Sequence, residues 1–144
     1  MGKEVEWFDG NWMKVRDLEK ENGWASLNRR DQVLLAVGFL IDSCIGDGEW
    51  AIVDGVIEGQ DEGLTVKMPD ALEQIGLSKI AEYVNNIILL RKPAGSKVND
   101  EANRERAVAQ WEKVLAAFGE FVPGGERVIL TTLYQWYHSP EATR

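Results

Sequence analysis

Hydrophobic residues recur at helical spacing along most of the chain. The clearest stripe follows Asn28 and consists of Val33, Leu34, Val37, Leu40, Ile41, Cys44 and Ile45. Leu35 and Phe39 lie off this stripe, so we expect a helix that is apolar on most of its circumference and packed on two sides. Asn28, with Asp31 three residues later, is the expected N-cap of this central helix. Cys44 belongs to the stripe and is expected to be a buried small hydrophobic residue.

Similar stripes predict further helices over about residues 12–21, 50–59, 70–75, 78–92, 100–118 and 128–137. The expected N-caps are Asn11, Ser78 and either Asn99 or Asp100. The expected stops include Asn22-Gly23, Gly59, Gly76 and Pro93. In the helix over 100–118 we expect Val108, Trp111, Val114, Leu115 and Phe118 to face inward. The last segment is rich in β-branched residues, which leaves a strand as an alternative there.

These elements predict an all-α, single-domain bundle of about six to seven helices. A chain of 144 residues can bury a proper core without disulfides, and its single cysteine cannot form one internally. Residues 1–26 are expected to form a helical extension packed on a core domain of residues 27–138, followed by a tail over 139–144. Trp7, Trp12 and Trp24 are expected to pack inside the molecule, with an exposed aromatic contact face as the alternative.

The charge is concentrated in one segment. Residues 31–66 contain eight acidic residues and no Lys, Arg or His, whereas the rest of the chain has 16 acidic and 16 basic residues. The net charge of -8 therefore comes entirely from this acidic segment. A basic protein is a more natural partner for such a segment than nucleic acid or an anionic membrane, since both of these attract Lys and Arg.

Several of these acids share a helix face. Asp47, Asp54 and Glu58 fall within about 40° of one another at 100° per residue. Solvated helix faces usually mix charges of both signs, so a cation-free ridge favours a binding surface, with simple solvation as the alternative. The candidate partner-binding residues are Asp42, Asp47, Glu49, Trp50, Asp54, Glu58, Asp61 and Glu62.

No catalytic signature accompanies the acidic segment. The only histidine, His138, is expected to be an exposed tail residue, and one Cys with one His cannot build a zinc site. The sequence contains no nucleophile elbow, phosphate-binding loop or zinc helix, and we expect no cofactor. The N-terminus lacks a secretory signal, which favours the cytoplasm, and no apolar run is long enough to span a membrane.

Four segments resemble a bacterial family of small helical domains, largely of unknown function, whose best-known member is a DNA mimic. They are the apolar helix after Leu27-Asn28, the Gly46-Asp47-Gly48-Glu49-Trp50 turn, residues 71–76 with Ala81, and Asn99-Asp100 leading to Arg104. The family usually has Asn-Gly-Gly-Phe at the turn, and here Asp47, Glu49 and Trp50 replace that pattern. The resemblance implies an all-α fold and, as in the characterised member, a dimer whose carboxylates stand in for DNA phosphates.

We therefore expect a non-enzymatic module whose acidic face engages a basic protein, such as a DNA-binding regulator. An alternative is an immunity-type partner that neutralises a toxin enzyme through an aromatic centre at Trp50 with an acidic rim. A hydrolase that uses paired carboxylates is a third hypothesis. We also expect self-association to a homodimer through one of the apolar helices.

Overall fold

A computed structural model describes residues 2–45, 52–53, 64–90, 101–119 and 127–140. These residues form helices and no strand, which confirms the all-α, single-domain prediction. The α-helices are α1 (Gly2–Asn22), α2 (Arg29–Ile45), α4 (Met68–Gln74), α5 (Ser78–Leu89), α6 (Glu101–Gly119) and α7 (Arg127–Tyr137). Two short 3-10 helices, η1 (Trp24–Ser26) and η3 (Thr65–Lys67), precede α2 and α4. Because α7 is helical, the strand alternative for this segment is excluded.

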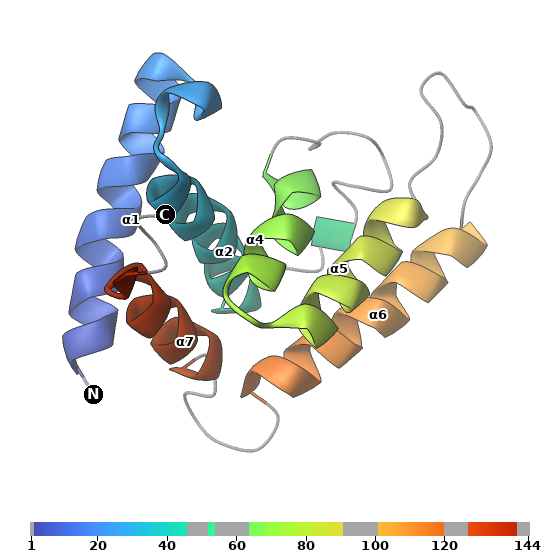
Figure 1. Ribbon diagram of the computed structural model, residues 1–144. Coiled ribbons are helices and arrows are strands. Elements are labelled where there is room, and N and C mark those ends of the chain that lie inside the picture. Colours follow the sequence, from blue (N-terminus) through green and yellow to red (C-terminus); the bar gives the residue numbers. More distant parts are fainter. Residues whose placement is uncertain (1, 46–51, 54–63, 91–100, 120–126, 141–144) are drawn as a thin grey trace.

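Helix α2 lies at the centre of the bundle (Figure 1). Helices α1 and α7 pack against it and against each other, and α4 packs against another side of it. Helix α4 in turn contacts α5, and α5 pairs with α6 at the far side of the molecule from α1 (Figure 1). The N-terminal helix thus belongs to the same packed body as the rest of the described chain.

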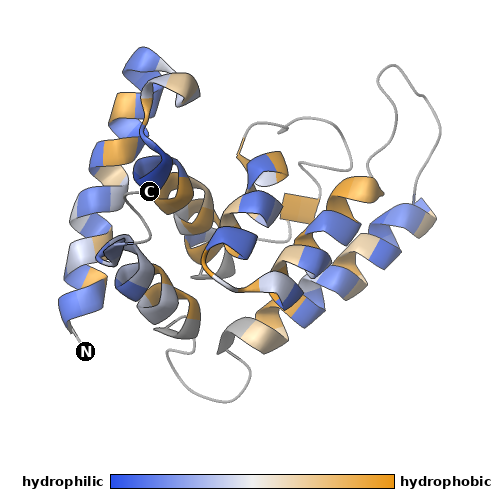
Figure 2. Ribbon diagram, viewed as in Figure 1, coloured by the Kyte–Doolittle hydropathy of each residue, from blue (hydrophilic) through white to orange (hydrophobic). Residues whose placement is uncertain are grey.

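Helix α2 is buried on both sides, as its sequence predicts. Leu34 on the main stripe and Leu35 off it are both 0% exposed, and much of α2 is hydrophobic in Figure 2. Asn28 caps the helix, since its Oδ1 accepts a hydrogen bond of 2.8 Å from the backbone N–H of Asp31. Because other helices of the same chain cover α2, its apolarity is accounted for without a second copy of the protein.

Helix α1 is longer than predicted. It begins at Gly2 instead of near Trp12, so the expected start of the helix and the expected cap at Asn11 are both wrong. Asn11 lies inside the helix, and its Nδ2 donates a 2.8 Å hydrogen bond to the carbonyl of Trp7. The helical penalty of Gly10, about 1 kcal/mol, is outweighed by the burial of Phe8 in the core. The helix ends as predicted, with Gly23 at a φ of 86°.

Trp12 joins α1 to α2 at a glycine. Its ring lies over Gly38, where any Cβ would overlap the indole, and its Nε1 donates a 3.3 Å hydrogen bond to the carbonyl of Leu35. Phe8 stacks on Trp12 with ring centroids 5.8 Å apart. The absence of a side chain at Gly38 therefore allows the two helices to approach closely and bury both aromatic rings.

Two details of the second half differ from the prediction. Ser78 makes no capping hydrogen bond because Leu77, in the short connection after Gly76, occupies the N-cap position and Ser78 is already helical. On α6, Trp111 and Val114 are buried as expected, but Leu115 is 38% exposed because it lies about 100° around the helix from Val114.

The predicted short helix is confirmed as α4, with Pro69 in its first turn. The side chains of Cys44 and Phe118 lie outside the described part of the chain.

Candidate functional site

The structure places one of the predicted partner-binding residues. Asp42 lies in the last turn of α2 with its side chain exposed. The other predicted residues lie outside the described ranges: Asp47, Glu49, Trp50, Asp54, Glu58, Asp61 and Glu62. Within the same segment, Ile52 and Val53 are described, and both are 0% exposed.

Asp42 occupies an electrostatically unfavourable position. The C-terminal end of a helix carries a partial negative charge, and an acid there costs typically 0.3–1 kcal/mol, in contrast to the gain from a basic residue. The last turn of α2 contains no basic residue. Asp42 therefore does not stabilise the helix that carries it, and its charge is presented to the surroundings.

Asp31, the first acid of the segment, has a structural role. Its Oδ1 accepts a hydrogen bond of 3.0 Å from the hydroxyl of Tyr137, which joins the start of α2 to the end of α7. Burial raises the pKa of the Tyr137 phenol above its usual value of 10.0, and the hydrogen bond and charge of Asp31 raise it further. The positive charge of Arg30 lowers the pKa of the Tyr137 phenol. One carboxylate of the acidic segment is thus used inside the fold.

This contact predicts a dependence on alkaline pH. A phenol whose pKa is raised by folding contributes stability that is complete below its ordinary pKa and is lost as the pH rises through the folded value. At pH 8 we expect Tyr137→Phe to be less stable than the wild type by about 1 kcal/mol, measured by urea unfolding. Between pH 10 and 11.5 this difference should shrink, because only the wild type loses the contribution of this phenol.

A matched control is Tyr134→Phe, because the Tyr134 hydroxyl donates no hydrogen bond within the described part of the chain. This variant should retain wild-type stability at pH 8 to within about 0.5 kcal/mol. A constant difference between the wild type and Tyr137→Phe from pH 8 to 11.5 would contradict the assigned role of the hydroxyl.

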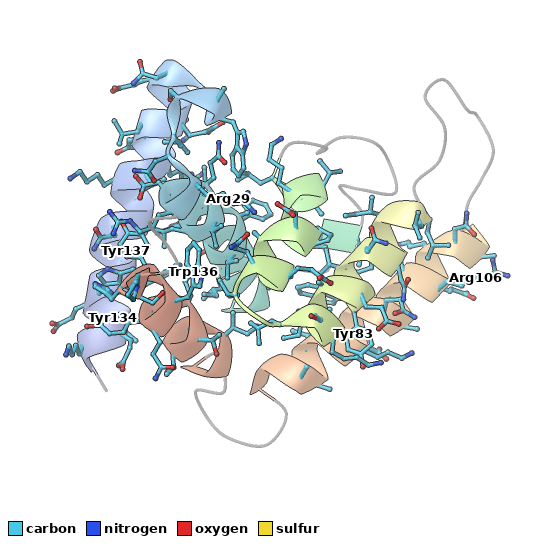
Figure 3. All side chains as sticks on the ribbon, in the orientation of Figure 1. Arg29, Tyr83, Arg106, Tyr134, Trp136 and Tyr137 are labelled. Carbon is cyan, nitrogen blue, oxygen red and sulfur yellow. The ribbon has the colours of Figure 1, made fainter. Side chains whose placement is uncertain are left out.

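Four aromatic side chains meet where α1 packs against the end of α7, and we name this set the aromatic face: Trp7, Tyr134, Tyr137 and His138. The Trp7 ring lies edge-on to Tyr134 and Tyr137, with centroid distances of 5.2 and 5.1 Å. The His138 ring lies 4.4 Å from Tyr134 and 5.4 Å from Trp7. Figure 3 labels both tyrosines at this junction of α7 with α1. None of the four side chains is buried, so their rings reach the surface.

Two cations lie over these rings. Lys3 of α1 has its Nζ 5.7 Å from the centroid of the Tyr134 ring, and the guanidinium carbon of Arg30 is 4.7 Å from that of Tyr137. Cation–π contacts of this kind stabilise by about 0.5–1 kcal/mol at exposed sites. The aromatic face therefore combines apolar contact area with positive charge, unlike the acidic segment.

His138 was predicted to be an exposed tail residue, and only its exposure is confirmed. His138 is exposed, yet its Nδ1 lies 2.9 Å from the carbonyl of Tyr134, so the ring is held in place instead of belonging to a loose tail. The spacing of Tyr134, Tyr137 and His138 at i, i+3 and i+4 places all three on one face at the end of α7, where the backbone N–H of His138, just past the helix, still bonds the carbonyl of Tyr134. That spacing could have revealed the face from the sequence, whereas the contribution of Trp7 depends on how α1 packs.

The described residues contain no group of three or more His, Cys, Asp and Glu that could hold a metal ion. No helix in the described ranges has both the length and the apolarity that crossing a membrane requires. Arg29 forms an ion pair with Asp70 at 2.6 Å, and Lys79 forms one with Glu82 at 3.4 Å, both at the surface. Arg29 appears in Figure 3 near the start of α2, where this pair joins α2 to α4.

The fold and these surfaces define a single-domain, all-α protein with an acidic segment and an aromatic face, which meet where Asp31 bonds Tyr137. Comparison with protein-family models, with curated proteins and with solved structures gave no match. The resemblance to the DNA-mimic family thus stays a prediction from sequence.

Proposed function

We propose that this chain is a non-enzymatic protein-binding module whose acidic segment engages a basic protein. The observation that carries the proposal is the distribution of charge: eight acids without a cation in residues 31–66 supply the whole net charge of -8, and the remainder is balanced. Solubility alone would be served by acids mixed with bases over the whole surface.

The position of Asp42 supports this proposal. An exposed acid at the C-terminal end of a helix costs stability, so its presence favours a role outside the fold. The scaffold behind it is firm, because Leu40 and Ile41 next to it are 0% and 1% exposed. A carboxylate on such a scaffold loses little conformational freedom on binding, which favours affinity.

A more specific form of the proposal is that the acidic segment mimics DNA. DNA carries one charge per about 1.7 Å of its axis, a density that one helix ridge does not reach, so a mimic needs acids from several elements or from two subunits. A DNA-binding regulator is the partner that such a surface would suit. The homodimer expected from sequence would supply the second set of carboxylates.

The first test is a charge reversal in the acidic segment. The chain is immobilised and used to capture partners from a bacterial lysate, and the affinity of the main captured protein is then measured at low and high salt. The double substitution Asp54→Lys with Glu58→Lys should weaken binding at least about tenfold, because close charge pairs across an interface commonly contribute 1.5 kcal/mol or more. Binding of the wild type should weaken strongly at 1 M salt, where the Debye length falls to about 3 Å.

A matched control carries the same change of charge elsewhere. Glu105→Lys with Glu112→Lys reverses two exposed acids of α6 and should leave the affinity within about threefold of the wild type. Equal losses in both double variants would show that the partner responds to net charge alone and would overturn the proposed site. Displacement of the captured protein by duplex DNA would support mimicry, whereas a salt-resistant enzyme would favour the immunity-type alternative.

A further inference from the structure

The aromatic face presents hydrogen-bond donors that the fold does not use. Within the described part of the chain, the indole N–H of Trp7 and the hydroxyl of Tyr134 have no hydrogen-bond partner, and neither side chain is buried. His138 Nδ1 faces the carbonyl of Tyr134 and donates to it, so Nε2 of the neutral ring is an acceptor, without a partner among the described residues. Two donors, one from α1 and one from α7, thus have no partner among the described residues.

The cations at this face are also without an acidic partner. Neither Lys3 nor Arg30 forms an ion pair with a described residue, although both lie over tyrosine rings. Of the nearby acids, Asp31 is occupied by the Tyr137 hydroxyl, Glu4, one turn before Trp7, is half-buried, and Glu6, three residues after Lys3, is exposed. Lys3 and Arg30 are therefore two cations that no described carboxylate pairs with, beside one exposed carboxylate.

The residue types are those that dominate protein interfaces. Trp, Tyr and Arg are enriched among the residues that contribute most to binding energy, and Tyr and Trp offer large contact area at a small cost in side-chain entropy. The ring contacts of Trp7 with Tyr134 and Tyr137 hold this area in one arrangement before a partner arrives. A preorganised surface of this kind lowers the entropic cost of binding.

We propose that the aromatic face, together with Lys3 and Arg30, is a second docking surface that binds an acidic segment of a partner protein. Carboxylates of the segment would be bound by the two cations and by the free N–H and O–H groups, while its apolar side chains pack on the rings. This surface uses residues and a sign of charge different from those of the acidic segment, so it goes beyond the proposed function and is tested independently of it.

A hexaglutamate peptide with blocked ends is a stringent probe. The protein as a whole carries a net charge of -8 and repels a polyanion, so saturable binding requires a local site. A titration at low salt, monitored through the NMR signals of the indole N–H groups, should shift the signal of Trp7. Among the signals of the six tryptophans, that of Trp7 is identified by its absence in Trp7→Phe. Hexalysine should leave that signal in place.

The charge-reversed variant Lys3→Glu with Arg30→Glu should weaken hexaglutamate binding at least tenfold. The matched control, Lys14→Glu with Lys20→Glu, changes two exposed lysines of α1 by the same charge and should weaken it less than threefold. Tyr134→Phe keeps the ring and removes one donor, so it should weaken binding by about threefold to fivefold. This variant tests the site even if the charge-reversed variants are unstable.

Two results would overturn the proposal. One is the absence of any saturable shift of the Trp7 indole signal with the wild-type protein at low salt. The other is an equal loss of affinity in the Lys14/Lys20 control, which would mean that the peptide senses overall charge. Neither result would bear on binding of a basic protein by the acidic segment.

Discussion

Gly38→Ala is expected to destabilise the protein by at least about 2 kcal/mol, although alanine is the better helix former. The added Cβ would overlap the indole of Trp12 and would lie 3.0 Å from Cε1 of Phe8. Trp12 cannot move away freely, because its Nε1 is bonded to the Leu35 carbonyl and its ring is 7% exposed. Urea unfolding followed by circular dichroism would show the loss as a lower midpoint.

Gly10→Ala is the matched control, because Gly10 is also helical and a Cβ there would meet no atom within 4 Å. This variant should be more stable than the wild type by about 0.5–1 kcal/mol, the ordinary gain from alanine in a helix. The two glycine variants should therefore differ in sign. A stabilising effect of Gly38→Ala would show that α1 does not pack on α2 through Trp12.

The helices with strong apolar periodicity could be predicted from the sequence. The central helix, its two-sided burial and its Asn28 cap follow from local spacing and from one side-chain oxygen, and the structure confirms them. The close approach of Trp12 to Gly38 could not be predicted, because it depends on the packing of two helices that are separate in sequence.

The errors in α1 and α5 arise where packing or loop length overrides a local preference. Gly10 and Asn11 are turn formers in isolation, but the tertiary burial of Phe8 and Trp12 outweighs their preference. Ser78 has the chemistry of an N-cap, yet the short link after α4 places Leu77 in that position. Local propensity is a weak prior wherever packing or loop length decides the backbone.

The candidate sites differ in how far the sequence could define them. The acidic segment is a property of composition and is therefore visible in the sequence, whereas Asp42 is the one predicted binding residue that the structure places. Asp31 shows why composition is insufficient: its carboxylate belongs to the same segment but bonds Tyr137 inside the fold. The aromatic face needed the packing of α1 on α7 before Trp7 could join it.

Leu35→Ala is expected to destabilise the protein by about 2–5 kcal/mol. Leu35 lies off the main apolar stripe of α2, yet it is 0% exposed, since helices pack on more than one side of α2. Truncation removes its buried methyl groups and leaves a cavity that the surrounding helices fill only in part. Urea unfolding would show the loss as a lower free energy of unfolding. The dependence of that free energy on urea concentration, the m-value, is compared with that of the wild type.

Leu89→Ala makes the same chemical change on the surface, because Leu89 is 72% exposed at the end of α5. It should change the stability by less than about 0.5 kcal/mol. The ratio of the stability losses in the two leucine variants measures the burial of the second side of α2, because the change in side-chain chemistry is the same in both. Similar small losses in both would mean that α2 is packed on one side only, and its second apolar side would then be free for the homodimer contact expected from its sequence.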